Sequence, residues 1–300
     1  MPIPEAQLQV WANQGGTASA QAAYASVRAA LSSATSPPNV LACDVYLQGS
    51  YRNDTNVRAD SDVDVVAEFD GSFGYDTLAL PPEQVQRFHS TYVDSSSNIW
   101  TNLRTDVLSA LRSWYGTNGV EERSRCIKVL ATSNRLAVDV IPALQYRRYS
   151  YFWGPGLESY VGGVRFYDRA GRSIINYPKA HYENGVAKNS LLRTAGRFKR
   201  TVRMFKNART AATDRGYLND GVASSYFIDC LIWNVPDDKF VDALQDTYCN
   251  VVNYLHNSTL TGFMCRNGIV PLFGTTPEQW SEVSARQLVA ALARLWNEWY

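Results

Sequence analysis

Three aspartates in this sequence have the spacing of a metal site. Asp62 and Asp64 lie two residues apart in the alternating, β-branched run DVDVVAEF, so both carboxylates are expected on one face of a strand. Asp139 lies inside the apolar run LAVDVIPAL, where a lone carboxylate is costly unless a charged group compensates it. Carboxylates that converge from two strands suit Mg²⁺, and two such ions can stabilise the attacking and leaving oxygens of phosphoryl transfer.

A glycine-serine turn supports this interpretation. Gly49 and Ser50 end the short apolar segment 41–50, twelve residues before Asp62. Backbone N–H groups at such a turn can bind anionic oxygens. A lone Asp-x-Asp motif more often belongs to a solvated loop, but its combination with this turn and a third strand aspartate is far more specific.

A basic segment supplies charge of the opposite sign. Residues 197–209 predict a helix with an apolar stripe on one side and Lys199, Arg203 and Lys206 on another. Residues 188–215 hold nine Lys or Arg against one Asp, whereas residues 51–100 hold nine Asp or Glu against three Arg. A triphosphate that bridges metal ligands and a basic helix would account for both segments. The alternative is a solvated charged face.

The elements that must position these residues fall into two halves. The first half is predicted to mix strands and helices, and from about residue 190 the pattern is helical, with loop 178–190 as the connection. The first half is predicted to contain helices at 17–34 and 81–115, strands at 41–50 and 62–69, two strands within 123–144, and a hairpin at 162–178 that turns at Asp168–Gly171.

Composition excludes several classes of protein. The 300 residues are 45% hydrophobic, enough for a real core, and 29 Lys plus Arg against 28 Asp plus Glu argue against a general nucleic-acid binder. No stretch approaches the roughly 20 apolar residues of a membrane span, and the N-terminus lacks a basic-then-apolar signal pattern, so we expect a cytoplasmic protein. Five scattered cysteines and three scattered histidines do not predict a disulfide framework or a zinc site.

The chain resembles a known family. The run GSYRNDTNVRADSDVDVV (49–66), with VDV at 138–140, is similar to the DNA polymerase β-type nucleotidyltransferase superfamily, and within it to the bacterial cGAS/DncV-like nucleotidyltransferases (CD-NTases). Four further segments resemble the clade E enzymes of that family, the CdnE group: PEAQLQVWANQGGT, INYPKAHYENGVAKN, RFKRTVRMFKNAR and SSYFIDCLIWNVP. The resemblance covers most of the chain.

The resemblance implies an α+β fold. A polymerase β-like mixed-sheet core and a C-terminal helical domain are expected, joined by a long N-terminal helix. Residues 1–180 would form the catalytic core with this helix, and residues 181–300 would form the helical domain that closes the nucleotide pocket.

The resemblance also assigns catalytic roles. Asp62, Asp64 and Asp139 would bind two Mg²⁺ ions, which Mn²⁺ could replace, and Asp139 would lie nearest the attacking hydroxyl. Gly49 and Ser50 would contact the triphosphate. Asp60 has the same spacing but is expected in the preceding loop, because the matched motif begins at Asp62.

Further nucleotide contacts follow from the resemblance. They are Lys206 and Ser225 at the triphosphate, Tyr226 stacked on the donor base, and an asparagine that reads a pyrimidine. Asn176 is the first choice for this last role, and Asn184 and Asn189 stay open. The alternative roles are a core aromatic for Tyr226 and a strand-end cap for Asn176.

The implied activity is the synthesis of a cyclic dinucleotide from two NTPs. The product would be 3′,5′-linked and contain uridine, as cyclic di-UMP or cyclic UMP-AMP, made from UTP, ATP or both. It would activate a separate effector protein in antiphage (CBASS) signalling, and the enzyme would be a monomer without stable nucleic-acid binding. The alternatives are a linear oligonucleotide or RNA nucleotidyltransferase, and a catalytically silent nucleotide or RNA sensor.

Overall fold

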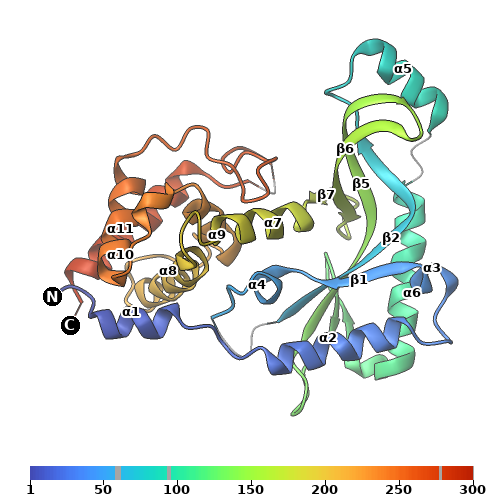
Figure 1. The fold of residues 1–300 in the computed structure, drawn as a ribbon. Coiled ribbons are helices and arrows are strands. Elements are labelled where there is room, and N and C mark those ends of the chain that lie inside the picture. Colours follow the sequence, from blue (N-terminus) through green and yellow to red (C-terminus); the bar gives the residue numbers. More distant parts are fainter. Residues whose placement is uncertain (58–61, 93–95, 277–278, 300) are drawn as a thin grey trace. The chain divides into compact units, whose positions relative to one another are not determined.

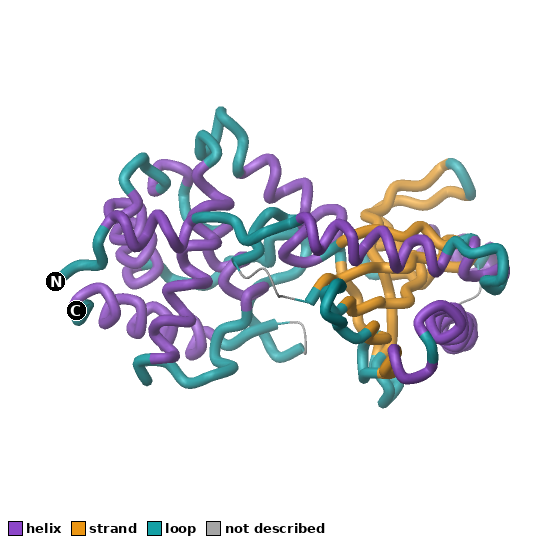
Figure 2. Tube along the Cα trace, turned by 90° about the horizontal axis from the view of Figure 1, so that it is seen from below, coloured by secondary structure: helices purple, strands orange, loops and turns teal. Residues whose placement is uncertain are grey.

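The chain forms two compact units in the computed structural model (Figures 1 and 2). The structure describes residues 1–57, 62–92, 96–276 and 279–299, so Asp60 lies outside the described residues. The unit made of Thr17–Tyr51 and Asp60–Lys179 is called the sheet unit here. The unit made of Met1–Gly16, Arg52–Ala59 and Ala180–Tyr300 is called the helical unit. No described helix is both long enough and apolar enough to cross a membrane.

A mixed sheet forms the centre of the sheet unit. Its described strands run in the order β1-β2-β5-β4-β3, while β6 pairs with both β5 and β7. β2 and β5 are parallel, and the other pairs are antiparallel. The strands are β1 (Cys43–Leu47), β2 (Val63–Asp76), β3 (Val120–Glu122), β4 (Ile127–Val129), β5 (Val138–Gly154), β6 (Leu157–Tyr167) and β7 (Ser173–Asn176).

Helices pack their apolar sides on this sheet. The β-branched residues Val65 and Val140 are fully buried and share one core with Val27 and Val107. The helical elements of the unit are α2 (Ala18–Leu31), α3 (Pro38–Leu41), α4 (Gly49–Arg52), α5 (Pro82–Thr91), α6 (Ser96–Tyr115) and the 3₁₀ turn η1 (Thr117–Gly119). Because side chains alternate along a strand, residues adjacent to the buried valines point to the opposite face.

The helical unit has its own core. The apolar stripe of α8 supplies Phe198, Val202 and Phe205, each at most 1% exposed. Its helices are α1 (Glu5–Ala12), α7 (Pro178–Lys188), α8 (Arg197–Asp214), α9 (Ser225–Trp233), the 3₁₀ turn η2 (Asp237–Lys239), α10 (Leu244–Asn257) and α11 (Glu282–Asn297). The helical second half and the mixed-sheet first half predicted from the sequence are therefore confirmed.

Several predicted boundaries change. The helix predicted at 17–34 is α2, which ends at Leu31. The hydroxyl of Ser36 donates to the carbonyl of Ala30 in its last turn at 3.1 Å. The helical stretch 81–115 contains two helices, α5 and α6. The loop predicted at 178–190 is wrong: α7 begins at Pro178, because proline suits the first position of a helix.

Two hairpins extend the sheet. The predicted turn at Asp168–Gly171 is confirmed: it joins β6 and β7, and the Asp168 carboxylate accepts hydrogen bonds from the backbone N–H groups of Ala170 and Arg172 at 2.9 Å. The β5–β6 hairpin was not predicted, although it turns at a Pro-Gly pair typical of turns.

Residues 53–56 are held in the helical unit by their side chains and backbone. Asp54 pairs with Lys199 at 2.7 Å, and its carbonyl accepts from Arg203 at 2.5 Å. The Asn56 side chain accepts a hydrogen bond from the Gln14 amide and donates one to the Gly15 carbonyl, both at 3.0 Å. Asp54 and Asn56 are thus bound to α8 and to the N-terminal residues of the helical unit.

A buried ion pair anchors the same segment. Arg266 is fully buried, pairs with Asp229 at 2.5 Å, donates to the His181 carbonyl at 2.9 Å and hydrogen-bonds the Asn53 side chain. Burial alone would raise the pKa of Asp229, but Arg266 and Lys206 hold it below its ordinary value. The Asp229 carboxylate is therefore charged inside the core.

Replacing Arg266 by methionine should destabilise the protein by about 3–5 kcal/mol, because it leaves the Asp229 charge buried and unpaired. Urea unfolding measures the free energy. The matched control Arg294→Met removes an exposed pair with Glu298 and a contact with the Tyr217 ring, and should cost less than about 1 kcal/mol. Adding Asp229→Asn to Arg266→Met should restore part of the lost free energy. An equal loss in Arg266→Met and Arg294→Met would contradict the ion-pair argument.

Candidate active site

Two of the predicted metal ligands face each other in the sheet. The parallel pairing of β2 and β5 places Asp64 opposite Asp139, and the antiparallel pairing of β4 and β5 places Lys128 opposite Asp139 on the other side. Residues paired across strands project to the same face of a sheet. Asp64, Asp139 and Lys128 therefore form one row on the face opposite the buried valines.

Asp62 completes the cluster. It lies directly before β2, two residues from Asp64, and its carboxylate accepts from the Lys128 ammonium at 2.5 Å. The three aspartates Asp62, Asp64 and Asp139 are called the acidic row below, and Lys128 lies beside it.

Like charges and burial dominate the electrostatics of the acidic row. Burial, followed by the charges of Asp139 and Asp62, raises the pKa of Asp64 to about 7. Burial also raises the pKa of Asp139, although Lys128 and a hydrogen bond from the Cys126 thiol oppose the rise. The Oδ1 atom of Asp139 is buried and has no hydrogen-bond partner within the described residues. One oxygen of Asp139 is thus buried without a partner that would compensate its desolvation.

This arrangement fits a divalent cation, although the side chains are not yet gathered around one. Among the described residues, no three carboxylate, imidazole or thiol groups are close enough to hold an ion as they stand. Asp62 is turned to Lys128. A hard dication would supply the buried Asp139 oxygen with a ligand and offset the repulsion between Asp64 and Asp139.

The glycine turn lies against Asp64. Gly49 has φ +67°, and a Cβ atom at this position would lie 2.0 Å from Oδ2 of Asp64. The backbone N–H of Gln48 donates to the Asp64 carbonyl at 2.9 Å. Gly49 and Ser50 form the start of the short helix α4, so the predicted turn is a single helical turn. The structure therefore brings the predicted phosphate-binding turn next to a predicted metal ligand.

Asn176 lies at the end of β7 and is partly buried. The two alternatives for a base-reading asparagine have structural partners. The Asn184 amide donates to the Arg266 carbonyl at 2.8 Å, and Oδ1 of Asn189 accepts from the Lys199 backbone N–H at 2.9 Å. Asn184 lies in α7 and Asn189 directly follows it, so both amides are engaged within the helical unit.

The basic helix α8 is largely engaged within the helical unit. Lys206 is 3% exposed and donates to the carbonyl and hydroxyl oxygens of Thr55 at 3.0 and 3.1 Å. Burial lowers the pKa of Lys206 to about 8, and nearby Asp229 limits the fall. Lys199, Arg203 and Lys206, the three basic residues predicted to share one side of the helix, thus contact Asp54 and Thr55.

Ser225 and Tyr226 begin α9 at its exposed end. The hydroxyl of Ser224, not Ser225, caps the helix by accepting from the Phe227 N–H at 3.1 Å, which leaves Ser225 exposed. The Tyr226 ring is stacked with His181 at a centroid distance of 5.0 Å and with Trp280 at 5.5 Å, and Tyr226 is 40% exposed. Tyr226 therefore belongs to an aromatic stack that reaches the surface.

Sequence reasoning missed Lys128. Its signal was a single lysine between Ile127 and Val129 in an apolar strand, close before the strand that carries Asp139. That pattern indicates a charged side chain on the face opposite the core. Which aspartate it would meet depends on strand order, which a local pattern does not contain.

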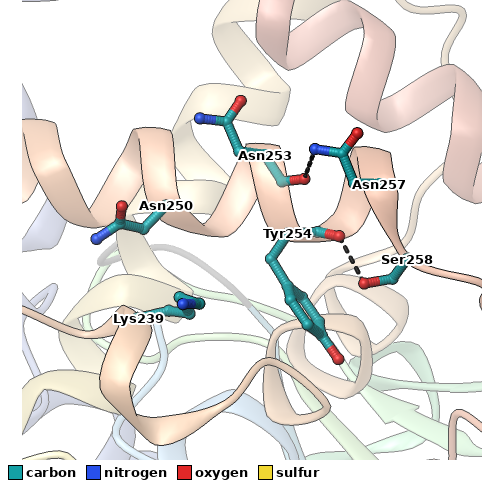
Figure 3. Close-up of a pocket in the computed structure, with 6 residues that line it drawn as sticks. All are labelled: Lys239, Asn250, Asn253, Tyr254, Asn257 and Ser258. Carbon is teal, nitrogen blue, oxygen red and sulfur yellow. Dashed lines mark hydrogen bonds between the residues drawn. The ribbon is translucent and has the colours of Figure 1, made fainter.

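A surface pocket beside α10 is lined by residues from 239–258 and by none of the site residues discussed above. Figure 3 shows its lining side chains, Lys239, Asn250, Asn253, Tyr254, Asn257 and Ser258. The Asn257 amide donates to the Asn253 carbonyl at 2.9 Å, and the Ser258 hydroxyl donates to the Tyr254 carbonyl at 2.7 Å. The pocket contains none of the predicted site residues.

Known proteins resemble this chain along its length. A family model for the cGAS/DncV-like nucleotidyltransferase C-terminal helical domain matches residues 183–297. The cyclic UMP-AMP synthase of Rhodothermus marinus (strain SG0.5JP17-172) is 43% identical, covering 100% of this chain and 99% of that protein. The cyclic nucleotide synthase CdnE01 of Staphylococcus haemolyticus is 33% identical, covering 100% of each.

A solved structure agrees with these sequences. The structure of Rhodothermus marinus CdnE c-UMP-AMP synthase with Apcpp and Upnpp matches with a TM-score of 0.86 at 42% identity, covering 99% of this chain and 98% of that one. The similarity therefore includes residues of both units.

Replacing Gly49 by alanine should disturb Asp64 beyond the cost of the backbone. Gly171 is a matched control, since it has φ +76° and open space around a Cβ. Both Gly→Ala changes should cost about 1–2 kcal/mol in unfolding free energy. Only Gly49→Ala should weaken binding of Mn²⁺, about tenfold, because the Asp64 carboxylate must turn away from the new methyl group. Equal Mn²⁺ affinities in the two variants, measured by calorimetry, would contradict this placement.

Proposed function

This chain belongs to the clade E (CdnE) group of the cGAS/DncV-like nucleotidyltransferases, and we propose that it makes cyclic UMP-AMP from UTP and ATP. Its full-length relatives are named cyclic nucleotide synthases, so the chain is a nucleotidyltransferase that makes a cyclic dinucleotide. The observation that carries the transfer reaction is the pairing of Asp64 with Asp139 on a sheet face beside the Gly49 turn. That the product contains uridine and is made from UTP and ATP is part of the proposal and rests on the 43% identity to a cyclic UMP-AMP synthase. We propose 3′,5′ linkages.

For the sheet unit, we propose that Asp62, Asp64 and Asp139 hold two Mg²⁺ ions, which Mn²⁺ can replace. When bound, the ions would neutralise charge on the attacking and leaving oxygens. Asp139 takes the proton of a 3′-hydroxyl, whose oxygen attacks the α-phosphorus of the other nucleotide as pyrophosphate leaves. A second transfer of the same kind closes the ring. The Gly49 backbone and the Ser50 hydroxyl orient the triphosphate.

For the helical unit, we propose nucleotide contacts by Lys206, Ser225 and Tyr226. Ser225 and Tyr226 are exposed, so they can meet a ligand directly. Lys206 is buried on Thr55, so a phosphate contact would require it to exchange this partner. The exposed part of the Tyr226 ring could stack on a base, since stacking tolerates any base.

The rest of the proposal concerns the roles of the two parts of the chain, the oligomeric state and the cellular role of the enzyme. We propose that residues 1–180 carry the transfer reaction and residues 181–300 form a nucleotide-binding helical domain. We further propose that the enzyme is a cytoplasmic monomer that does not bind nucleic acid stably. Its product would act on a separate effector in antiphage signalling.

The double variant Asp62→Asn, Asp64→Asn should lose cyclic product at least about a thousandfold, because bound metal supplies several kcal/mol of transition-state stabilisation. The assay incubates protein, Mg²⁺ and labelled NTPs, and identifies phosphatase-resistant product by mass spectrometry. Asp70→Asn, at an exposed position of the same strand β2, is the control and should keep activity within about twofold.

Other outcomes of the same assay identify the rival functions. Phosphatase-sensitive product would indicate a linear nucleotidyltransferase, and a nucleotide-dependent thermal shift without turnover would indicate a silent sensor. Activity retained in the double variant would show that the metal assignment is wrong.

Asn176→Asp should reduce the incorporation of UMP relative to AMP by about tenfold, since it removes one of two hydrogen bonds that an amide can make to uracil. Mass spectrometry of products from each NTP pair measures the ratio. Asn253→Ala, an exposed amide in the α10 pocket, is the control and should leave the ratio unchanged. An unchanged ratio in Asn176→Asp would assign base selection to another residue.

A further inference from the structure

Lys128 has a defined position beside the acidic row. It is the middle residue of β4, between the fully buried Ile127 and Val129, so its own side chain projects to the opposite face. The side chain is 23% exposed and the Asp62 side chain is 42% exposed, and the two form an ion pair of 2.5 Å. The strand register thus places Lys128 opposite Asp139, and a direct contact joins its ammonium group to the Asp62 carboxylate.

The acidic row needs a cation in the absence of metal. Asp64 and Asp139 stand opposite each other on adjacent strands, where like charges are destabilising. Within the described residues, the three aspartates form one ion pair, between Asp62 and Lys128. Arg123, another cation near Asp139, is paired with Glu121 at 2.5 Å. Lys128 is therefore the group that balances the row.

We propose that Lys128 is the resident counter-ion of the metal-free acidic row and that a divalent ion must displace it from Asp62 to bind. This inference rests on the proposed function, in which the three aspartates hold metal. Lys128 acts through Asp62, so it is a positioning residue. It stabilises the enzyme before metal binds and opposes the binding itself, because breaking the pair and approaching an ammonium both cost free energy.

A lysine suits such an exchange better than an arginine. Its ammonium is a compact point charge on a flexible stem, whereas a guanidinium binds a carboxylate in a fixed, two-pronged geometry. The partial exposure of Lys128 gives its ammonium access to water when it leaves Asp62. A divalent ion can therefore replace the Lys128 ammonium at Asp62, because the ammonium can move into water and is not left buried without a partner.

The test measures binding of Mn²⁺ alone by electron paramagnetic resonance, without nucleotide or turnover. Lys128→Met should bind Mn²⁺ about five- to tenfold more tightly than the natural protein, as expected for the loss of a competing charge. Its melting temperature without metal should fall by about 2 °C or more, and added Mn²⁺ should restore it. Lys128→Arg keeps the charge and should bind Mn²⁺ no more tightly than the natural protein.

Lys199→Met is the matched control, since Lys199 also pairs with an aspartate, at 2.7 Å, but within the helical unit. It should leave Mn²⁺ affinity unchanged. Equal or weaker Mn²⁺ binding in Lys128→Met would overturn the counter-ion proposal. Mn²⁺ binding that survives in Asp62→Asn, Asp64→Asn would instead overturn the metal assignment of the proposed function, so the two failures can be told apart. If neither the natural protein nor Lys128→Met binds Mn²⁺, both proposals are wrong.

Discussion

The parallel pairing of β2 with β5 is the constraint on which the sheet unit depends. Its register fixes Asp64 opposite Asp139 because the same register buries Val63, Val65, Val138 and Val140 on the other face. A slip by one residue would expose the valines and bury the carboxylates, so the hydrophobic core enforces a pairing of like charges. Burial, followed by the repulsion from Asp139 in that pairing and from Asp62, raises the pKa of Asp64. Lys128 supplies a cation on the same face of the sheet.

Both units use internal partners to balance charge. In the sheet unit Lys128 pairs with Asp62, and in the helical unit Arg266 pairs with the buried Asp229. The first pair is partly exposed and can open, whereas the second is closed and rigid because its members are desolvated and hydrogen-bonded. This difference suits their positions, because the first pair includes the proposed metal ligand Asp62, whereas Arg266 of the second binds the side chain of Asn53.

Local patterns in the sequence were enough to find the aspartates and the glycine turn. Strand parity places Asp62 and Asp64 on one face, and a carboxylate within LAVDVIPAL requires a special role. The partner of Asp62 could not be found in this way, because Lys128 meets it only through the strand order. The same limit applies to Lys206: helical spacing places it among basic residues, but its burial on Thr55 depends on a distant segment. The prediction of a loop at 178–190 was wrong because Pro178 begins the helix α7 and does not prevent it.

The most direct measurement of the central claim is an anomalous-difference map from crystals grown with Mn²⁺ and non-hydrolysable analogues of ATP and UTP. The account predicts Mn²⁺ peaks coordinated by Asp62, Asp64 and Asp139, with the Lys128 ammonium moved away from Asp62. Bound analogues with Mn²⁺ absent from the three aspartates, or an intact Lys128–Asp62 pair beside a filled metal site, would contradict it.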